Sequence, residues 1–175
     1  KTTWLIGPKV PDPEKYGTEY NSDYSFDVRN TEAKETVTFK NMTLQSGRVD
    51  YLGFAGTDNT IVEGCIIEGK TFYWGYTSAI FTQTTFKCPD GDYALWSYSS
   101  ATMTFDNCTF NSSGKVINVY NEGGTPNVEV NFKNCTVNNA KGTSKKAVLN
   151  INDRLVSGGF TINISGKNSV DGITA

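Results

Sequence analysis

Apolar residues recur along this chain in a short repeated unit. Each unit begins with a large apolar residue and has another five positions later, with Asn, Gly or Gln in the third position. A sixth, weaker copy is expected near Phe160–Ile164. Units of about 20 to 30 residues that repeat are typical of solenoids built from coils of short strands. The five clear copies are Phe39–Leu44, Val62–Ile67, Phe81–Phe86, Phe105–Phe110 and Phe132–Val137.

The third position predicts a bend in each unit. On a regular strand, residues i and i+2 point to the same face. The first, fourth and sixth positions therefore share one interior only if the strand bends near the third. Asn tolerates the left-handed backbone that such a bend requires. Cys65, Cys108 and Cys135 hold the fourth position, and we expect them to be free, buried thiols that act as small apolar residues. A disulfide between Cys108 and Cys135 is the alternative.

A second set of strands is predicted at a constant step of 22 residues, with Leu52, Trp74, Trp96 and Asn118 in equivalent positions. Tyr51, Tyr73, Leu95, Ile117 and Leu149 are assigned to the interior, because their face carries the smaller and more aliphatic residues. The opposite face is rich in aromatic side chains. It holds Leu52, Phe54, Phe72, Trp74, Tyr76, Trp96, Tyr98, Asn118 and Tyr120.

This aromatic face is the candidate binding site. A large apolar patch on a soluble domain usually marks a partner surface, and Trp and Tyr dominate the binding energy of interfaces. We expect Trp74, Tyr76, Trp96, Tyr98 and Tyr120 to be the anchors. Two alternatives remain open. In the first, the N-terminal segment covers the aromatic side chains. In the second, the assignment of the two faces is interchanged, and the Trp residues are in the core.

Composition removes several other classes of function. The chain has 175 residues, 17 of them Gly, a net charge of -2 and no His. The balance of charges argues against nucleic acid as a partner, and the missing His removes His-based catalysis and His-ligated metals. No apolar run approaches the roughly 18 residues that span a bilayer. No carboxylates recur as a pair on one predicted face, so we expect no catalytic residues, no metal and no cofactor. The acidic candidates are Asp50, Glu68, Asp90, Asp92, Asp106 and Asp153.

Repeats such as Phe105–Phe110 and Phe132–Val137 resemble the coils of right-handed parallel β-helix proteins. That group includes pectate-lyase-like enzymes and the adhesive segments of bacterial surface proteins. The resemblance implies an all-β fold, a right-handed parallel β-helix (β-solenoid) of about five to six coils. The resemblance covers about residues 36–170, and the β-helix is expected to comprise residues 36–175. Residues 1–35 do not repeat and are expected to form an N-terminal cap.

The resemblance also implies a place and a role. We expect an extracellular, non-catalytic binding module, monomeric within a larger bacterial surface protein. Its expected partner is a host protein, with immunoglobulin as one candidate, or a glycan. The alternatives are a polysaccharide-binding or degenerate lyase-like β-helix and a structural spacer. Fold alone does not decide between them, because this fold supports both enzymes and binding proteins.

Overall fold

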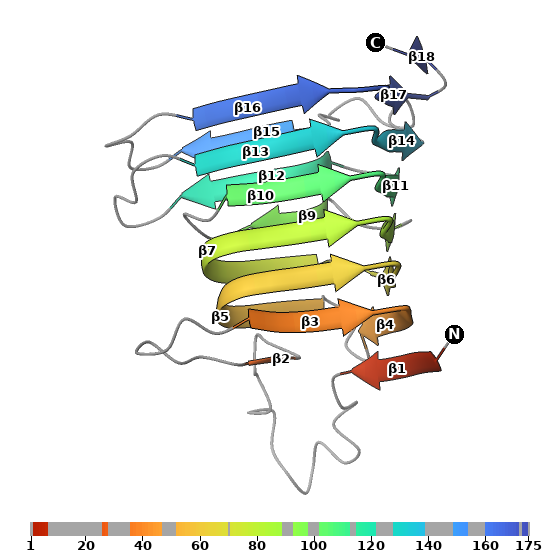
Figure 1. The fold of residues 1–175 in the computed structure, drawn as a ribbon, viewed down its shortest axis with the longest axis vertical. Helices are drawn as coiled ribbons and strands as arrows, with labels where there is room; N and C mark the ends of the chain where they lie inside the picture. Colours follow the sequence, from red (N-terminus) through yellow and green to blue (C-terminus); the bar gives the residue numbers. More distant parts are fainter. Residues whose placement is uncertain are drawn as a thin grey trace, which may run out of the picture.

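The computed structural model describes residues 2–6, 26–27, 36–46, 52–69, 71–88, 93–97, 102–112, 115–121, 128–138, 149–153, 160–171 and 173–174. All regular structure in these residues is β-strand. The strands lie in stacked sheets (Figure 1), and every strand pair is parallel apart from one antiparallel pair near the C-terminus. This confirms the prediction of an all-β chain of parallel strands and is consistent with a β-solenoid. No helix in the described part of the chain is long and apolar enough to cross a membrane.

The strands form two sheets (Figure 1). The eight-stranded sheet contains β1 (Thr2–Ile6), β4 (Met42–Ser46), β6 (Ile66–Glu68), β8 (Thr85–Cys88), β11 (Thr109–Ser112), β14 (Thr136–Asn138), β17 (Ser169–Val170) and β18 (Ile173–Thr174). The ten-stranded sheet contains β2 (Phe26–Asp27), β3 (Thr36–Lys40), β5 (Leu52–Glu63), β7 (Thr71–Thr82), β9 (Tyr93–Ser97), β10 (Thr102–Asp106), β12 (Lys115–Asn121), β13 (Val128–Lys133), β15 (Leu149–Asp153) and β16 (Phe160–Ser165).

The register of the first strand set follows the predicted repeat. The first apolar residue of each copy pairs with the first apolar residue of the next, in the order Phe39, Val62, Phe81, Phe105 and Phe132. The sixth copy begins later than predicted. Ile164 is the partner of Phe132, whereas Phe160 pairs with Val128.

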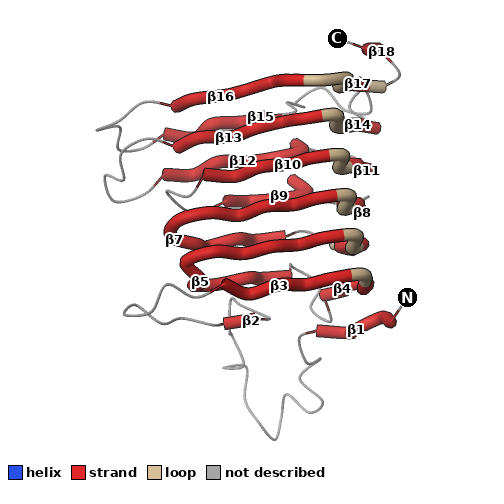
Figure 2. The backbone as a smooth tube through the Cα atoms, viewed as in Figure 1, coloured by secondary structure: helices blue, strands red, loops and turns tan. Residues whose placement is uncertain are grey.

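The predicted bends are present at the third position of each copy. Asn41, Asn107 and Asn134 all have φ of 54°, in the left-handed region, and Gln83 has φ of 49°. Each bend N–H donates to a carbonyl of the following coil, as Asn107 does to Lys133 at 2.9 Å. Figure 2 shows these bends as a column of short loop segments between strands of the two sheets. This repeated hydrogen bond aligns one coil with the next.

Two bends carry Gly for a steric reason as well. Gly64 has φ of +62°, and a Cβ built on it would lie 2.6 Å from the side-chain oxygen of Asn41. Gly166 has φ of +72° and meets the side-chain oxygen of Asn134 in the same way. Any other residue would displace the Asn side chain of the preceding coil. At these two bends, Gly therefore occupies the position that Asn occupies one coil earlier.

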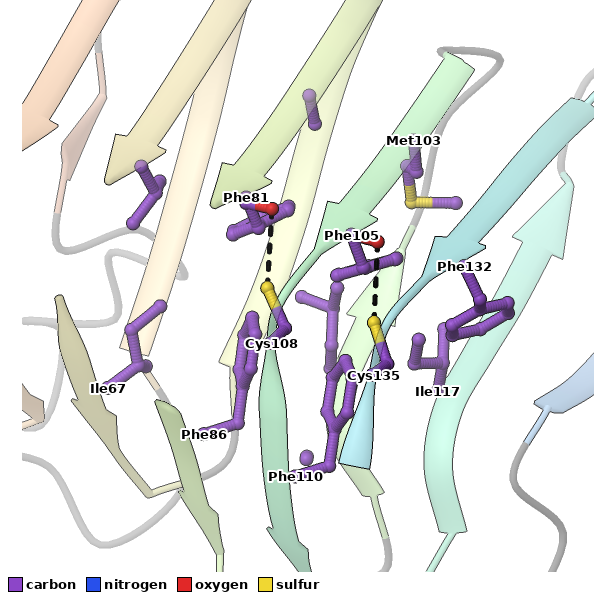
Figure 3. Packing of buried hydrophobic residues seen from close by; sticks show 14 of the residues in the cluster. Ile67, Phe81, Phe86, Met103, Phe105, Cys108, Phe110, Ile117, Phe132 and Cys135 are labelled. Atoms are coloured by element: carbon purple, nitrogen blue, oxygen red, sulfur yellow. Dashed lines mark hydrogen bonds between the residues drawn. The ribbon is translucent and has the colours of Figure 1, made fainter. Parts of the chain in front are cut away.

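The interior is filled by stacked aromatic rings (Figure 3). The rings of Phe81 and Phe105 are stacked with centroids 5.1 Å apart, and Phe105 and Phe132 follow at 5.5 Å. Phe86 and Phe110, from the sixth position of their copies, stack at 4.9 Å. Aromatic pairs at these separations add roughly 0.5–1.5 kcal/mol each beyond the burial of their area. Equivalent positions of successive copies therefore carry similar side chains, and these side chains stack into one continuous core.

The fourth position supplies a column of hydrogen-bond donors beside these rings (Figure 3). The thiols of Cys108 and Cys135 donate to the carbonyls of Phe81 and Phe105, at 3.2 and 3.3 Å. In the same position, the Thr84 hydroxyl donates to a carbonyl of the preceding coil at 3.2 Å. The sequence predicted buried thiols acting as apolar residues. Their burial is confirmed, but they act as donors as well.

The two ends of the solenoid differ in burial. At β16, Ile162 and Ile164 continue inward rows but are 43% and 68% exposed, because no further strand pairs with β16 in the described residues. At the other end, Phe39 is only 7% exposed. Two strands from residues 1–35 pair with strands of the repeat. β1 pairs with β4, and β2 pairs with β5. The predicted division at residue 35 stays a prediction.

Candidate functional site

The predicted aromatic face lies on β5, β7, β9 and β12 of the ten-stranded sheet. The backbone of eight of its nine residues is described, and Tyr98 lies outside the described residues. Among the nine, only the side chain of Asn118 is described. Register can therefore be compared with the prediction, whereas the exposure of the aromatic rings stays a prediction.

The inward row of this strand set is confirmed where it is described. Leu95 and Ile117 are register partners on β9 and β12, and both have 0% exposed area. Ile117 pairs in turn with Leu149 on β15. On the other side, Leu95 pairs with Thr71, which is also fully buried. Thr71 was not assigned to this row in the prediction, which had Tyr73 in its place.

The constant step of 22 residues is wrong for two of the coils. The partner of Trp96 on β7 is Phe72, not Trp74. Leu52 pairs with Thr71, so it is not in register with Trp74 or Trp96. The reason is the length of the connections that lead from the eight-stranded sheet to the ten-stranded sheet. Five residues separate β4 from β5, two separate β6 from β7, and four separate β8 from β9.

The corrected register still brings aromatic residues together. Phe72, Trp96 and Asn118 are successive partners across β7, β9 and β12. Trp74 follows Phe72 on β7, and Tyr120 follows Asn118 on β12, each by two residues. Adjacent strands lie about 4.8 Å apart. Four large aromatic residues therefore lie on three neighbouring strands, within two positions of one register row.

Asn118 differs from its prediction. It was assigned to the exposed face, but its side chain is 6% exposed. Ala94 on the neighbouring strand β9 is fully buried beside the inward Leu95. Successive residues of a strand point to opposite faces. Both faces of the sheet are therefore shielded from solvent at Ala94 and Leu95 on β9 and at Ile117 and Asn118 on β12. The prediction that Asn118 is exposed is wrong, and its role in binding stays a prediction.

The pattern analysis missed a second face, whose side chains are described from residue 59 on β5 and from residue 77 on β7. It is the outward side of β3, β5, β7, β10, β13 and β16, and it is mostly polar. Hydrogen bonds between side chains link neighbouring strands across it. Asn163 donates to Asn131 at 2.7 Å and to Glu129 at 3.2 Å, and Asn131 donates to Thr104 at 3.4 Å. The sequence signal for this face was a polar residue at nearly every second position of these strands, as at Thr102, Thr104 and Asp106 on β10.

Opposite charges also stack on the outer faces. Lys40 pairs with Glu63 at 2.8 Å, and Lys133 pairs with Asp106 at 3.1 Å. Lys87 pairs with Glu68 at 3.2 Å on the eight-stranded sheet. All three pairs join neighbouring coils and are partly exposed, so each contributes at most about 1 kcal/mol.

These pairs account for two of the acidic candidates named from the sequence, Glu68 and Asp106. Asp50, Asp90 and Asp92 lie outside the described residues, as does the side chain of Asp153. Within the described residues, no group of three or more Cys, Asp or Glu side chains is arranged to hold a metal ion.

The described cysteines, Cys65, Cys108 and Cys135, are free and buried. The contact with the Cys135 sulfur, together with burial, raises the pKa of the Cys108 thiol well above its ordinary value. A thiol is a nucleophile only as the thiolate, so Cys108 is held in its unreactive, donating form.

Comparisons of this chain with protein-family models, with curated proteins and with solved structures found no match.

Proposed function

We propose that this chain is a non-catalytic binding module that captures a partner protein through its aromatic strands. The observation that carries the proposal is the register of Phe72 with Trp96, beside Trp74 and Tyr120. Aromatic residues are the side chains that most often anchor interfaces. Strands that are hydrogen-bonded on both sides hold such anchors more rigidly than loops do. Little conformational entropy is then lost when the partner binds.

The finer features of the fold belong to the same proposal. The coils run right-handed, as parallel strands joined by crossovers almost always do. About five to six coils form the rod, and residues 1–35 cap it, because terminal coils of a solenoid need a polar covering. The likeness of the repeat to pectate-lyase-like and adhesin-type β-helices supports a place outside the cell, as one module of a larger surface protein.

The partner class follows from the surroundings of the aromatics. Of the thirteen residues that adjoin the nine residues of the aromatic face along the chain, six are Ser, Thr or Gly, one is an amide and none is a carboxylate. A glycan site pairs an aromatic platform with carboxylates and amides, whereas a broad platform with small neighbours suits a protein. A host protein is therefore the proposed partner, with immunoglobulin as the first candidate to test.

The experiment is a pull-down from human serum and mucus with four immobilised proteins. These are the wild type, Trp96→Ala, the double variant Trp74→Ala/Trp96→Ala, and Ile80→Ala as the matched control. Ile80 is an apolar side chain, 39% exposed, on the outer face of β7, six residues after Trp74 on the same strand. Far-UV circular dichroism first establishes that all four are folded. Purified immunoglobulin is then tested alone by surface plasmon resonance.

We expect wild type and Ile80→Ala to retain the same protein, and both Trp variants to lose it. A Trp anchor contributes about 2 kcal/mol or more, so its removal weakens binding roughly 30-fold or more. Equal retention by all four folded proteins would place the binding surface elsewhere. A wild type that retains nothing would refute protein capture.

Polysaccharide binding is the second candidate, and the described polar face favours it. Amides, hydroxyls and a carboxylate form hydrogen-bonded rows beside Ile80, from Thr104 through Asn131 to Asn163 and Glu129. Glycans are recognised by such polar groups beside an apolar surface. Binding of immobilised polysaccharides that is lost with Asn131→Ala, and kept with Trp96→Ala, would support this candidate over protein capture.

A further inference from the structure

We draw no further inference here: the strongest candidate, the edge of the ten-stranded sheet at β16 where Ile162 and Ile164 are exposed, carries nothing because the structure does not show what covers this apolar edge.

Discussion

The thiol of Cys108 donates a hydrogen bond to the main-chain oxygen of Phe81, which lies one coil earlier, at 3.2 Å. Cys135 makes the same bond to Phe105, and Thr84 makes it to Val62 with a hydroxyl. The property that Cys and Thr share is a short side chain that can donate. A donor at this point joins one coil to the next directly after the left-handed bend.

The first prediction follows from this shared donor. Cys108→Val fills nearly the same space but cannot donate, so it should lower the free energy of unfolding by about 1 kcal/mol. Cys108→Thr keeps a hydrogen-bond donor and should lower the free energy of unfolding less than Cys108→Val does. Urea unfolding followed by circular dichroism measures both. If Val and Thr gave equal stability, the hydrogen bond would not contribute to folding.

The pKa of the same thiol gives a second prediction. Because the folded state raises the pKa of Cys108 above its ordinary value of 9.0, it holds this proton more tightly than the unfolded state does. The same contact lowers the pKa of the Cys135 thiol to about 7. Above pH 9 the unfolded state therefore releases both protons while the folded state keeps that of Cys108, so the contribution of this pair to stability falls, by at most about 1.4 kcal/mol per pH unit.

The double variant Cys108→Thr/Cys135→Thr has neither thiol of this pair and should lose less stability between pH 9 and pH 10 than the wild type. Urea unfolding at the two pH values gives the difference. All other side chains are the same in the two proteins. An identical loss in the two proteins would contradict the prediction.

A third prediction compares two buried hydroxyls. Thr71 is fully buried, and its hydroxyl has no hydrogen-bond partner among the described residues. Thr84 is equally buried, but its hydroxyl donates to Val62. Thr71→Val should leave stability unchanged or raise it by up to about 1 kcal/mol, whereas Thr84→Val should lower it by about 1 kcal/mol. Thermal unfolding of the two variants gives the sign of each change, and a stability loss in Thr71→Val would show that its hydroxyl is paired.

A fourth prediction uses two residues of the same inward row. Phe105 has 0% exposed area and stacks between Phe81 and Phe132, whereas Ile164 is 68% exposed at the end of the row. Phe105→Ala should cost about 3–5 kcal/mol, which is enough to unfold many domains of this size. Ile164→Ala should cost about 0.5 kcal/mol or less. A large loss of stability in Ile164→Ala would mean that this end of the rod is covered in solution.

The fifth prediction concerns the aromatic strands. If Trp96 points outward, Trp96→Ala should unfold within about 0.5 kcal/mol of the wild type. The neighbouring Leu95 is fully buried, and Leu95→Ala should cost about 2–5 kcal/mol. A Trp96→Ala protein that fails to fold would refute the exposed face and assign Trp96 to the core.

The first strand set could be predicted from sequence because each copy carries its own marker of position. Asn41, Asn107 and Asn134 hold a backbone conformation that few residues adopt. A slip by one residue would take Asn out of the bend and turn the inward row outward. The second strand set has no such marker. Its register depends on how many residues connect the strands, and the predicted pairing of Trp74 with Trp96 was therefore wrong by two positions.

The sequence alone determined the all-β class, the inward row and the bends, because these depend on residues a few positions apart. Only the tertiary structure decided which positions of a row are covered by a neighbouring coil and therefore buried. Ile164 has the pattern of a core residue and is exposed, whereas Asn118 has the pattern of a surface residue and is buried. Burial depends on which strands and side chains lie next to a residue in space, and in a solenoid that neighbour is a whole coil away along the chain.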